Sequence, residues 1–330
     1  MAWETGTATD HVDLFNKIRN FLTTNTDLVN AGENWEQMLG PTGTLVHGDQ
    51  ITLRGPGLTG TDNIYFGMET LESSSSDAYN IQFWGHASFS DTLAPRDQAL
   101  KSPDQWVLLW NQPMTYWIIA NGRRWMLVVK VSTVYSSAYC GFMLPYAAPS
   151  EYPYPMVVAG ISYTGGGTRW STEDGRSRFF ASPGYNTMFT YWPDNVWRLV
   201  ANYYDSSSSD NPRPGYRGAG FVHPTMHFNN YFAIGNNRND IELESPDALE
   251  VTYNADKCFD GSYFLRDLTI ISSAWEGPYD SVLGVLDGAY WIPGRANSSE
   301  NIVNKDGVDH LVVQNLFRNG FRDYMALRLT

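Results

Sequence analysis

The clearest pattern of apolar and polar positions lies at residues 114–132, where two apolar runs flank an Asn-Gly pair. Residues 114–120 and 123–132 are rich in aromatic and β-branched side chains, and Asn121-Gly122 separates them. Asn-Gly between such runs is the strongest local indication of a β-hairpin, because a type I′ turn needs positive φ at both central residues. We therefore predict a hairpin with a type I′ turn, in which Ala120 faces Arg123.

Both faces of this predicted hairpin are largely apolar. In the predicted register, one face carries Tyr116, Ile118, Trp125 and Leu127, and the other carries Trp117, Ile119, Met126 and Val128. Strands with one face in water alternate apolar with polar residues, and these two do not. We therefore expect the hairpin to lie inside the protein, with its tryptophans in the core rather than on a binding surface. The same expectation holds for Trp84, Trp106 and Trp110.

The segment that follows, residues 145–155, alternates tyrosine with proline. Proline lacks a backbone N–H and fixes φ, so this segment forms neither a helix nor a central strand. We expect an extended, polyproline-like segment, which we name the Pro/Tyr strap. It either contacts another subunit or domain, or packs back on its own domain. The interface residues predicted here are Pro145, Tyr146, Pro149, Tyr152, Pro153, Tyr154 and Pro155.

One segment near the N-terminus has helical periodicity. Thr9 or Asp10 is placed to cap it, and its apolar residues recur on one face: Leu14, Phe15, Ile18, Phe21 and Leu22. A second, short helix is expected at residues 26–31, before Gly32. The N-terminal 30 residues are therefore predicted to form a helical segment.

Beyond this segment the pattern changes to short apolar runs separated by turn residues. Strands are expected at residues 50–54, 63–68, 79–88, 106–110, 137–144, 156–161, 231–234, 248–253, 263–273, 282–286, 290–292, 310–317 and 324–329. Asp287-Gly288 is expected to form a second tight hairpin turn. Strands at this spacing indicate an all-β fold that resembles a β-sandwich, in one or two packed modules. We place the modules at residues 31–165, which include the central hairpin, and 166–330.

Composition and charge narrow the classes of function. Aromatic residues make up 15% of the chain and charged residues only 17%, which favours a protein with extensive contact surface. The net charge of −13 argues against nucleic acid as a partner, since phosphate binding needs clustered Lys and Arg. No apolar run is long enough to insert in a membrane. The first residues lack the pattern of a secretion signal, so synthesis in the cytosol is expected. Cys140 is expected in the core.

The sequence contains none of the common catalytic motifs, so we predict no enzyme, no cofactor and no metal. Three weaker patterns are each better explained as loop or strand-end residues. His223 and His227 have ligand-like spacing, but Pro224 argues against a helix there. Residues 235–242 are rich in oxygen ligands but lack calcium-loop spacing. Loop carboxylates of the kind that a glycosidase uses occur at Glu173, Asp174, Asp205 and Asp210.

Several segments resemble virion structural proteins of tailed bacteriophages. They are residues 5–14, 53–58, 64–67, 109–155 and 287–294, with sequences that include LRGPGL, IYFG, LWNQPM and DGAYWIPG. The resemblance spans most of the chain, is strongest over residues 1–160, and is looser over residues 165–225. It provides no catalytic residues.

This resemblance implies a structural component of the virion, in the tail or its distal tip, the baseplate. The expected partners are other virion proteins and further copies of this chain in a ring, with interfaces at the Pro/Tyr strap and the N-terminal helix. The expected location is the virion, after synthesis in the host cytoplasm. Two alternatives remain open at this point: a carbohydrate-binding module for a host-surface glycan, and a hydrolase of cell-envelope glycans.

Overall fold

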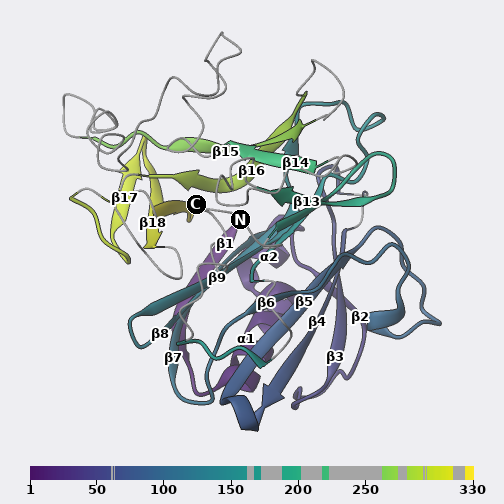
Figure 1. Ribbon diagram of the computed structural model, residues 1–330, viewed down its shortest axis with the longest axis vertical. Coiled ribbons are helices and arrows are strands. Elements are labelled where there is room, and N and C mark those ends of the chain that lie inside the picture. The colour runs from purple at the N-terminus through teal and green to yellow at the C-terminus, as the bar shows by residue number, and fades with distance from the viewer. Residues whose placement is uncertain are drawn as a thin grey trace, which may run out of the picture.

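The computed structural model describes residues 1–60, 62, 64–161, 167–171, 188–201, 218–222, 262–273, 281–292, 294, 296–314 and 324–330 (Figure 1). The fold is all-β with helices near the N-terminus, as the sequence predicts. The predicted strands at residues 231–234 and 248–253 lie outside the described residues.

Two helices follow the first strand: α1 (His11–Thr24) and α2 (Thr26–Ala31). Asp10 caps α1, because its side chain accepts a hydrogen bond of 2.8 Å from the backbone N–H of Asp13. The chain leaves α2 at Gly32, whose φ of 66° is one that glycine adopts without strain. The predicted apolar face of α1 is buried, and its members are Leu14, Phe15, Ile18, Phe21 and Leu22.

The smaller sheet is antiparallel and has five strands in the order β2-β3-β4-β5-β6. Their bounds are β2 (Glu36–Leu39), β3 (Gln50–Gly55), β4 (Ile64–Ser73), β5 (Ala78–His86) and β6 (Gln105–Val107). Two short 3₁₀ helices, η1 (Ser74–Ser76) and η2 (Pro95–Asp97), lie in its connections. One face of this sheet is buried against α1 and the larger sheet.

The larger sheet has 14 strands in the described part of the chain. Along the sheet they are β1 (Ala2–Ala8), β7 (Met114–Asn121), β8 (Arg124–Val131), β9 (Val134–Phe142), β11 (Met156–Ala159), β12 (Met188–Tyr191), β13 (Trp197–Ala201), β14 (Gly218–Val222), β15 (Arg266–Ser273), β16 (Ser281–Trp291), β19 (Tyr324–Arg328), β18 (Val308–Gln314) and β17 (Ile302–Lys305), with β10 (Leu144–Pro145) paired to β16. Among the strands of the described residues, only β13 and β14 pair in parallel. The predicted module boundary at residue 165 lies between β11 and β12, which are neighbours in this sheet.

The predicted central hairpin is present as β7 and β8, with a different turn. Asn121 pairs with Arg124 and Ala120 with Trp125, so the register differs by two residues from the predicted one. Neither Asn121 nor Gly122, the central residues of the predicted turn, has positive φ, which excludes the predicted type I′ turn. The Asn121 side chain instead accepts hydrogen bonds of 3.0 Å from the backbone N–H groups of Arg123 and Arg124.

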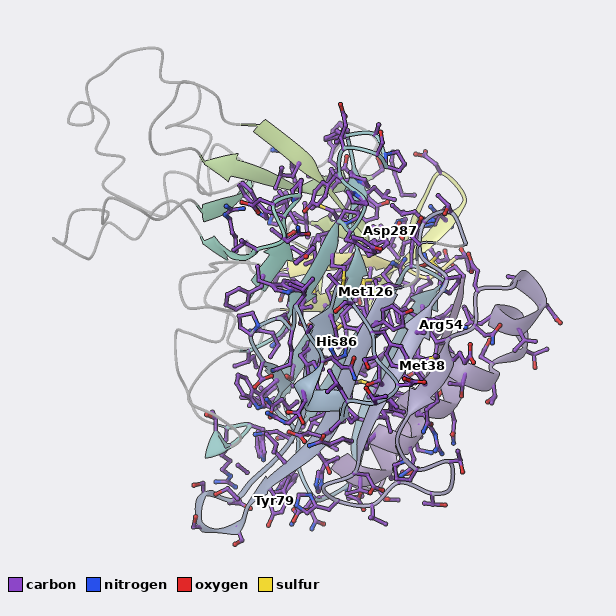
Figure 2. All side chains as sticks on the ribbon, turned by 90° about the vertical axis from the view of Figure 1, so that its right-hand side faces the viewer. Met38, Arg54, Tyr79, His86, Met126 and Asp287 are labelled. Carbon is purple, nitrogen blue, oxygen red and sulfur yellow. The ribbon has the colours of Figure 1, made fainter. Side chains whose placement is uncertain are left out.

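A shift of two residues leaves every side chain on its predicted face, and both faces are buried. The first core contains Ile118, Trp125 and Leu127 packed with α1 and the smaller sheet. The second core contains Trp117, Met126 and Val128 packed with β15, β16, β18 and β19. The hairpin strands are therefore a middle layer, which Figure 1 shows between the smaller sheet and the C-terminal strands. Figure 2 shows Met126 among the side chains packed there.

The prediction of a second hairpin at Asp287-Gly288 is wrong. Strand β16 continues through both residues from Ser281 to Trp291. The register against β15 shifts here, because Asp267 pairs with Tyr290 while Thr269 pairs with Val285. Gly288 has a φ of 70°, so a pattern typical of a tight turn forms an irregularity inside a long strand.

Candidate functional site

The Pro/Tyr strap packs back on its own chain over part of its length. Tyr152 is buried in the second core, and its hydroxyl donates a hydrogen bond to the backbone carbonyl of Tyr191. Pro155 is buried and Tyr154 is half-buried against the first core. These three residues anchor the strap within the chain.

The other strap residues lie at the surface. Tyr146 is 67% exposed, Pro149 and Pro153 are exposed, and Pro145 is half-buried. The backbone at Tyr146 is nevertheless fixed, because its N–H donates a hydrogen bond of 3.0 Å to the carbonyl of Leu283. The residue before Tyr146, Pro145, pairs with Gly284 of β16. The strap therefore presents Tyr146 on a backbone that the larger sheet holds in place.

A charged cluster joins the hairpin turn to the irregularity in β16. We name its four residues, Asn121, Arg123, Arg124 and Asp287, the Asp287 cluster. Asp287 Oδ2 accepts three hydrogen bonds, from Arg123 Nε at 2.8 Å, Asn121 Nδ2 at 3.0 Å and Arg124 Nε at 3.2 Å. The Arg124 side chain is fully buried, and the Asp287 side chain is 8% exposed.

Opposing effects set the ionisation of Asp287. Burial alone raises the pKa of its carboxyl group, whereas Arg124, Arg123 and Asn121 lower it, and the net pKa lies below the ordinary value. The carboxylate is therefore charged at neutral pH. Arg124 Nη1 is buried without a hydrogen-bond partner, so Asp287 provides much of the compensation that this guanidinium has.

The Asp287 cluster borders a cavity of about 350 Å³. Its lining residues are Met1, Glu33, Asn121, Arg123, Arg124, Asp287, Arg328 and Thr330. None of these lining residues is a histidine, cysteine or serine. The arrangement is that of an ion-pair lock between the middle layer and the C-terminal strands.

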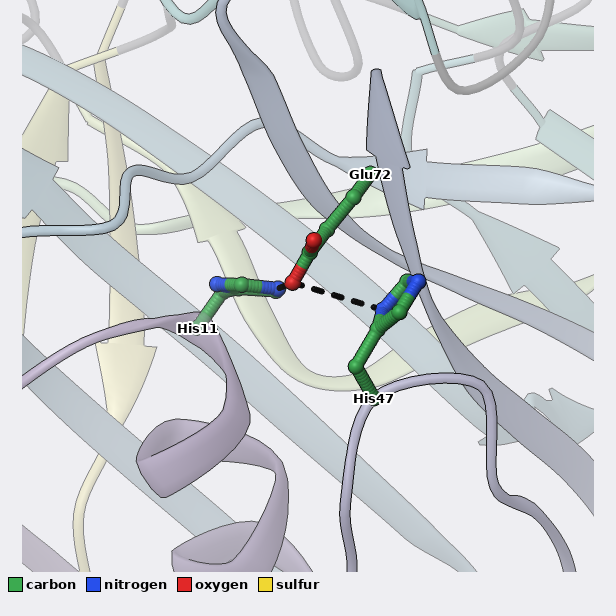
Figure 3. A group of neighbouring side chains, drawn as sticks. All are labelled: His11, His47 and Glu72. Atoms are coloured by element: carbon green, nitrogen blue, oxygen red, sulfur yellow. Dashed lines mark ion pairs between the residues drawn. The ribbon is translucent and has the colours of Figure 1, made fainter. Parts of the chain in front are cut away.

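A second polar group brings together ligand atoms of the kind that bind metals. His11, His47 and Glu72 each offer one ligand atom, and these atoms lie within 4.8 Å of one another (Figure 3). No short spacing in the sequence relates these three residues, which are separated by 36 and 25 residues. The pair with ligand-like spacing, His223 and His227, lies outside the described residues.

The remaining weak sequence patterns also lie outside the described residues. They are residues 235–242 and the carboxylates Glu173, Asp174, Asp205 and Asp210. Cys140, in contrast, is described and buried in the first core as predicted. Burial raises the pKa of its thiol well above the ordinary value.

Comparisons with known proteins add no family. No protein-family model matches the sequence. A search of curated proteins gives no match either. No helix in the described part of the chain combines the length and the apolar character that a membrane crossing requires.

Proposed function

We propose that this chain is a structural subunit of a tailed-phage virion that acts through protein–protein contacts and not through catalysis. Its place is in the tail or baseplate, as a homo-oligomeric ring in contact with other virion proteins. The sequence resemblance over residues 1–160 supports the phage assignment. The observation that carries the assembly function is the exposure of Tyr146 on a segment whose backbone the larger sheet holds.

Physical reasons favour Tyr146 as a contact residue. Tyrosine is enriched among the residues that dominate binding energy at interfaces, because it combines a large apolar ring with a hydroxyl group. The fixed strap backbone loses little conformational freedom when a partner binds. Pro149 and Pro153 add exposed, rigid apolar surface on the same strap. Tyr152 does not serve this role in the folded chain, since it is buried in the second core.

The assembly function is tested by solution mass. We expect the purified chain to form oligomers larger than its 37.2 kDa protomer, as measured by light scattering during size-exclusion chromatography. Tyr146→Ala should weaken assembly about 30-fold or more if Tyr146 dominates the interface energy. Phe264→Ala is the matched control, because Phe264 is an exposed aromatic residue on a different segment. Equal weakening by both variants would contradict a specific role for the strap.

Three further measurements separate the phage assignment from its alternatives. Mass spectrometry of purified particles should detect the chain among the virion proteins, and its recovery only in the soluble lysate would overturn the assignment. Glycan-array binding that Tyr146→Ala abolishes, with an unchanged solution mass, would favour the carbohydrate-binding module. New reducing ends in host polysaccharide after incubation with the protein would favour the hydrolase.

A further inference from the structure

The group of His11, His47 and Glu72, which we name the His–Glu cluster, converges on a single carboxylate oxygen. His11 Nε2 lies 3.0 Å and His47 Nδ1 lies 3.4 Å from Glu72 Oε1. Figure 3 shows the two rings on either side of this oxygen. His11 is the first residue of α1, Glu72 lies near the end of β4, and His47 lies in the connection between β2 and β3.

The orientation of His11 differs from that expected of a hydrogen-bonded ion pair. The side chain is 4% exposed, yet neither of its ring nitrogens makes an aligned hydrogen bond. A short distance without alignment is the arrangement that metal ligands have, because their lone pairs point at a shared ion and not at each other. Buried polar groups are otherwise nearly always hydrogen-bonded.

The two nitrogen–oxygen separations also agree with a tetrahedral zinc site. Ligand bonds of 2.0–2.1 Å at tetrahedral angles place neighbouring ligand atoms about 3.3 Å apart. The two nitrogen–oxygen distances, 3.0 and 3.4 Å, bracket this value. The side chain of His47 is 45% exposed, so a rotation of this ring can bring its nitrogen closer to that of His11.

The connection that carries His47 is held against α1 and β4 in advance. Asn16 of α1 receives a hydrogen bond of 2.8 Å from the backbone N–H of Leu45 and donates one of 2.9 Å to its carbonyl. Gly48 N–H donates a hydrogen bond of 3.1 Å to Thr70 Oγ1. These contacts flank His47 on both sides in the sequence. The backbone around these ligands is therefore fixed in advance, and Zn²⁺ binding at His47 Nδ1 replaces the hydrogen bond of 3.2 Å that joins this atom to Thr70 Oγ1.

We propose that the His–Glu cluster binds one zinc ion through His11 Nε2, His47 Nδ1 and Glu72 Oε1, with water as the fourth ligand. Two imidazoles and one carboxylate are a donor set that zinc prefers, whereas magnesium and calcium prefer oxygen ligands. The bound ion ties the start of α1 and the β2–β3 connection to β4. This site does not depend on the proposed function in assembly.

Metal titration of the intact chain tests the site. Calorimetry with Zn²⁺ should give one ion per chain, and Co²⁺ should give the visible absorption bands of a tetrahedral complex. Zn²⁺ should also raise the melting temperature, because the ligands converge only in the folded state. Mg²⁺ should do neither. Absence of Zn²⁺ binding to the wild-type chain would overturn the proposal.

Variants then assign the ligands. His47→Ala and Glu72→Gln should weaken Zn²⁺ binding at least about 100-fold, since loss of even an outer hydrogen-bond partner often costs 10- to 100-fold. Both residues are partly exposed, so the fold should persist, which circular dichroism checks. The matched control is the double variant His223→Ala/His227→Ala, which removes the other histidine pair and should leave binding unchanged. Loss of binding in that control, with retention in His47→Ala, would overturn the assignment.

Discussion

Replacement of Asp287 by asparagine tests the ion-pair lock between the middle layer and the C-terminal strands. The side chain keeps its shape and loses its charge. Arg124 is fully buried and already has one nitrogen without a hydrogen-bond partner. Asp287→Asn therefore leaves a buried guanidinium without its carboxylate. We expect a large loss of stability.

The magnitude follows from the burial of the pair. Removal of one partner from a buried ion pair typically costs 3–5 kcal/mol, because the remaining charge stays desolvated. An asparagine carbonyl oxygen in the place of Asp287 Oδ2 can still accept hydrogen bonds from these donors, which places the expected cost near the lower end, about 3 kcal/mol. An exposed pair such as Arg54–Glu36 contributes only about 0–1 kcal/mol.

Urea unfolding followed by tryptophan fluorescence measures this difference. Asp287→Asn should lower the free energy of unfolding by about 3 kcal/mol, and the control Glu36→Gln by less than about 1 kcal/mol. The double variant Asp287→Asn/Arg124→Met should recover part of the loss, because it removes the uncompensated charge as well. A cost for Asp287→Asn equal to that of Glu36→Gln would refute the reasoning.

The pH dependence gives the same experiment a second readout. The pKa of Asp287 in the folded chain lies below the ordinary value of 3.8, so the unfolded chain takes up this proton first as the pH falls. The stabilisation by the carboxylate is therefore present above pH 3.8 and is lost as the pH falls through the folded-state pKa. The difference in the free energy of unfolding between wild type and Asp287→Asn should become smaller as the pH falls over that range. An unchanged difference at low pH would contradict the assignment.

Three further outcomes follow from single buried residues. Gly288→Ala should destabilise the fold in thermal unfolding, because its φ is 70° and a Cβ there would collide with Arg124 Nη2. Burial lowers the pKa of His86 from 6.5 to about 3, so the unfolded chain is protonated first as the pH falls. The free energy of unfolding should therefore fall by about 1.4 kcal/mol for each unit that the pH falls between these values. His86→Phe should flatten that slope in urea unfolding at a series of pH values. In a Cys258→Ser background, Cys140 should react with a thiol reagent only at the rate of unfolding, since it is fully buried.

Much of the middle layer was predictable from the sequence, because the two hairpin strands are adjacent in the chain and their faces follow from the order of the side chains. The faces of the hairpin depend on alternation of side chains, and a register shift of two residues preserves them. The edge strand β1 was not predicted. Its burial alternates regularly along the strand, but its residue types, AWETGTA, do not alternate between apolar and polar, and its pairing with β7 joins segments more than 100 residues apart. The His–Glu cluster was missed for the same reason, since no short spacing relates its members.

The Asp287 cluster explains why two turn predictions failed in opposite ways. Asn-Gly and Asp-Gly both have the local preferences of tight turns. In the fold the two pairs meet, and Asn121 donates a hydrogen bond to Asp287 while its carbonyl oxygen caps the hairpin turn. The positive φ occurs at Gly288, where it allows Arg124 to approach, and not at Gly122. A long-range ion pair thus outweighs local turn preference at both positions, and the residues that mark turns in the sequence instead join two layers of the protein.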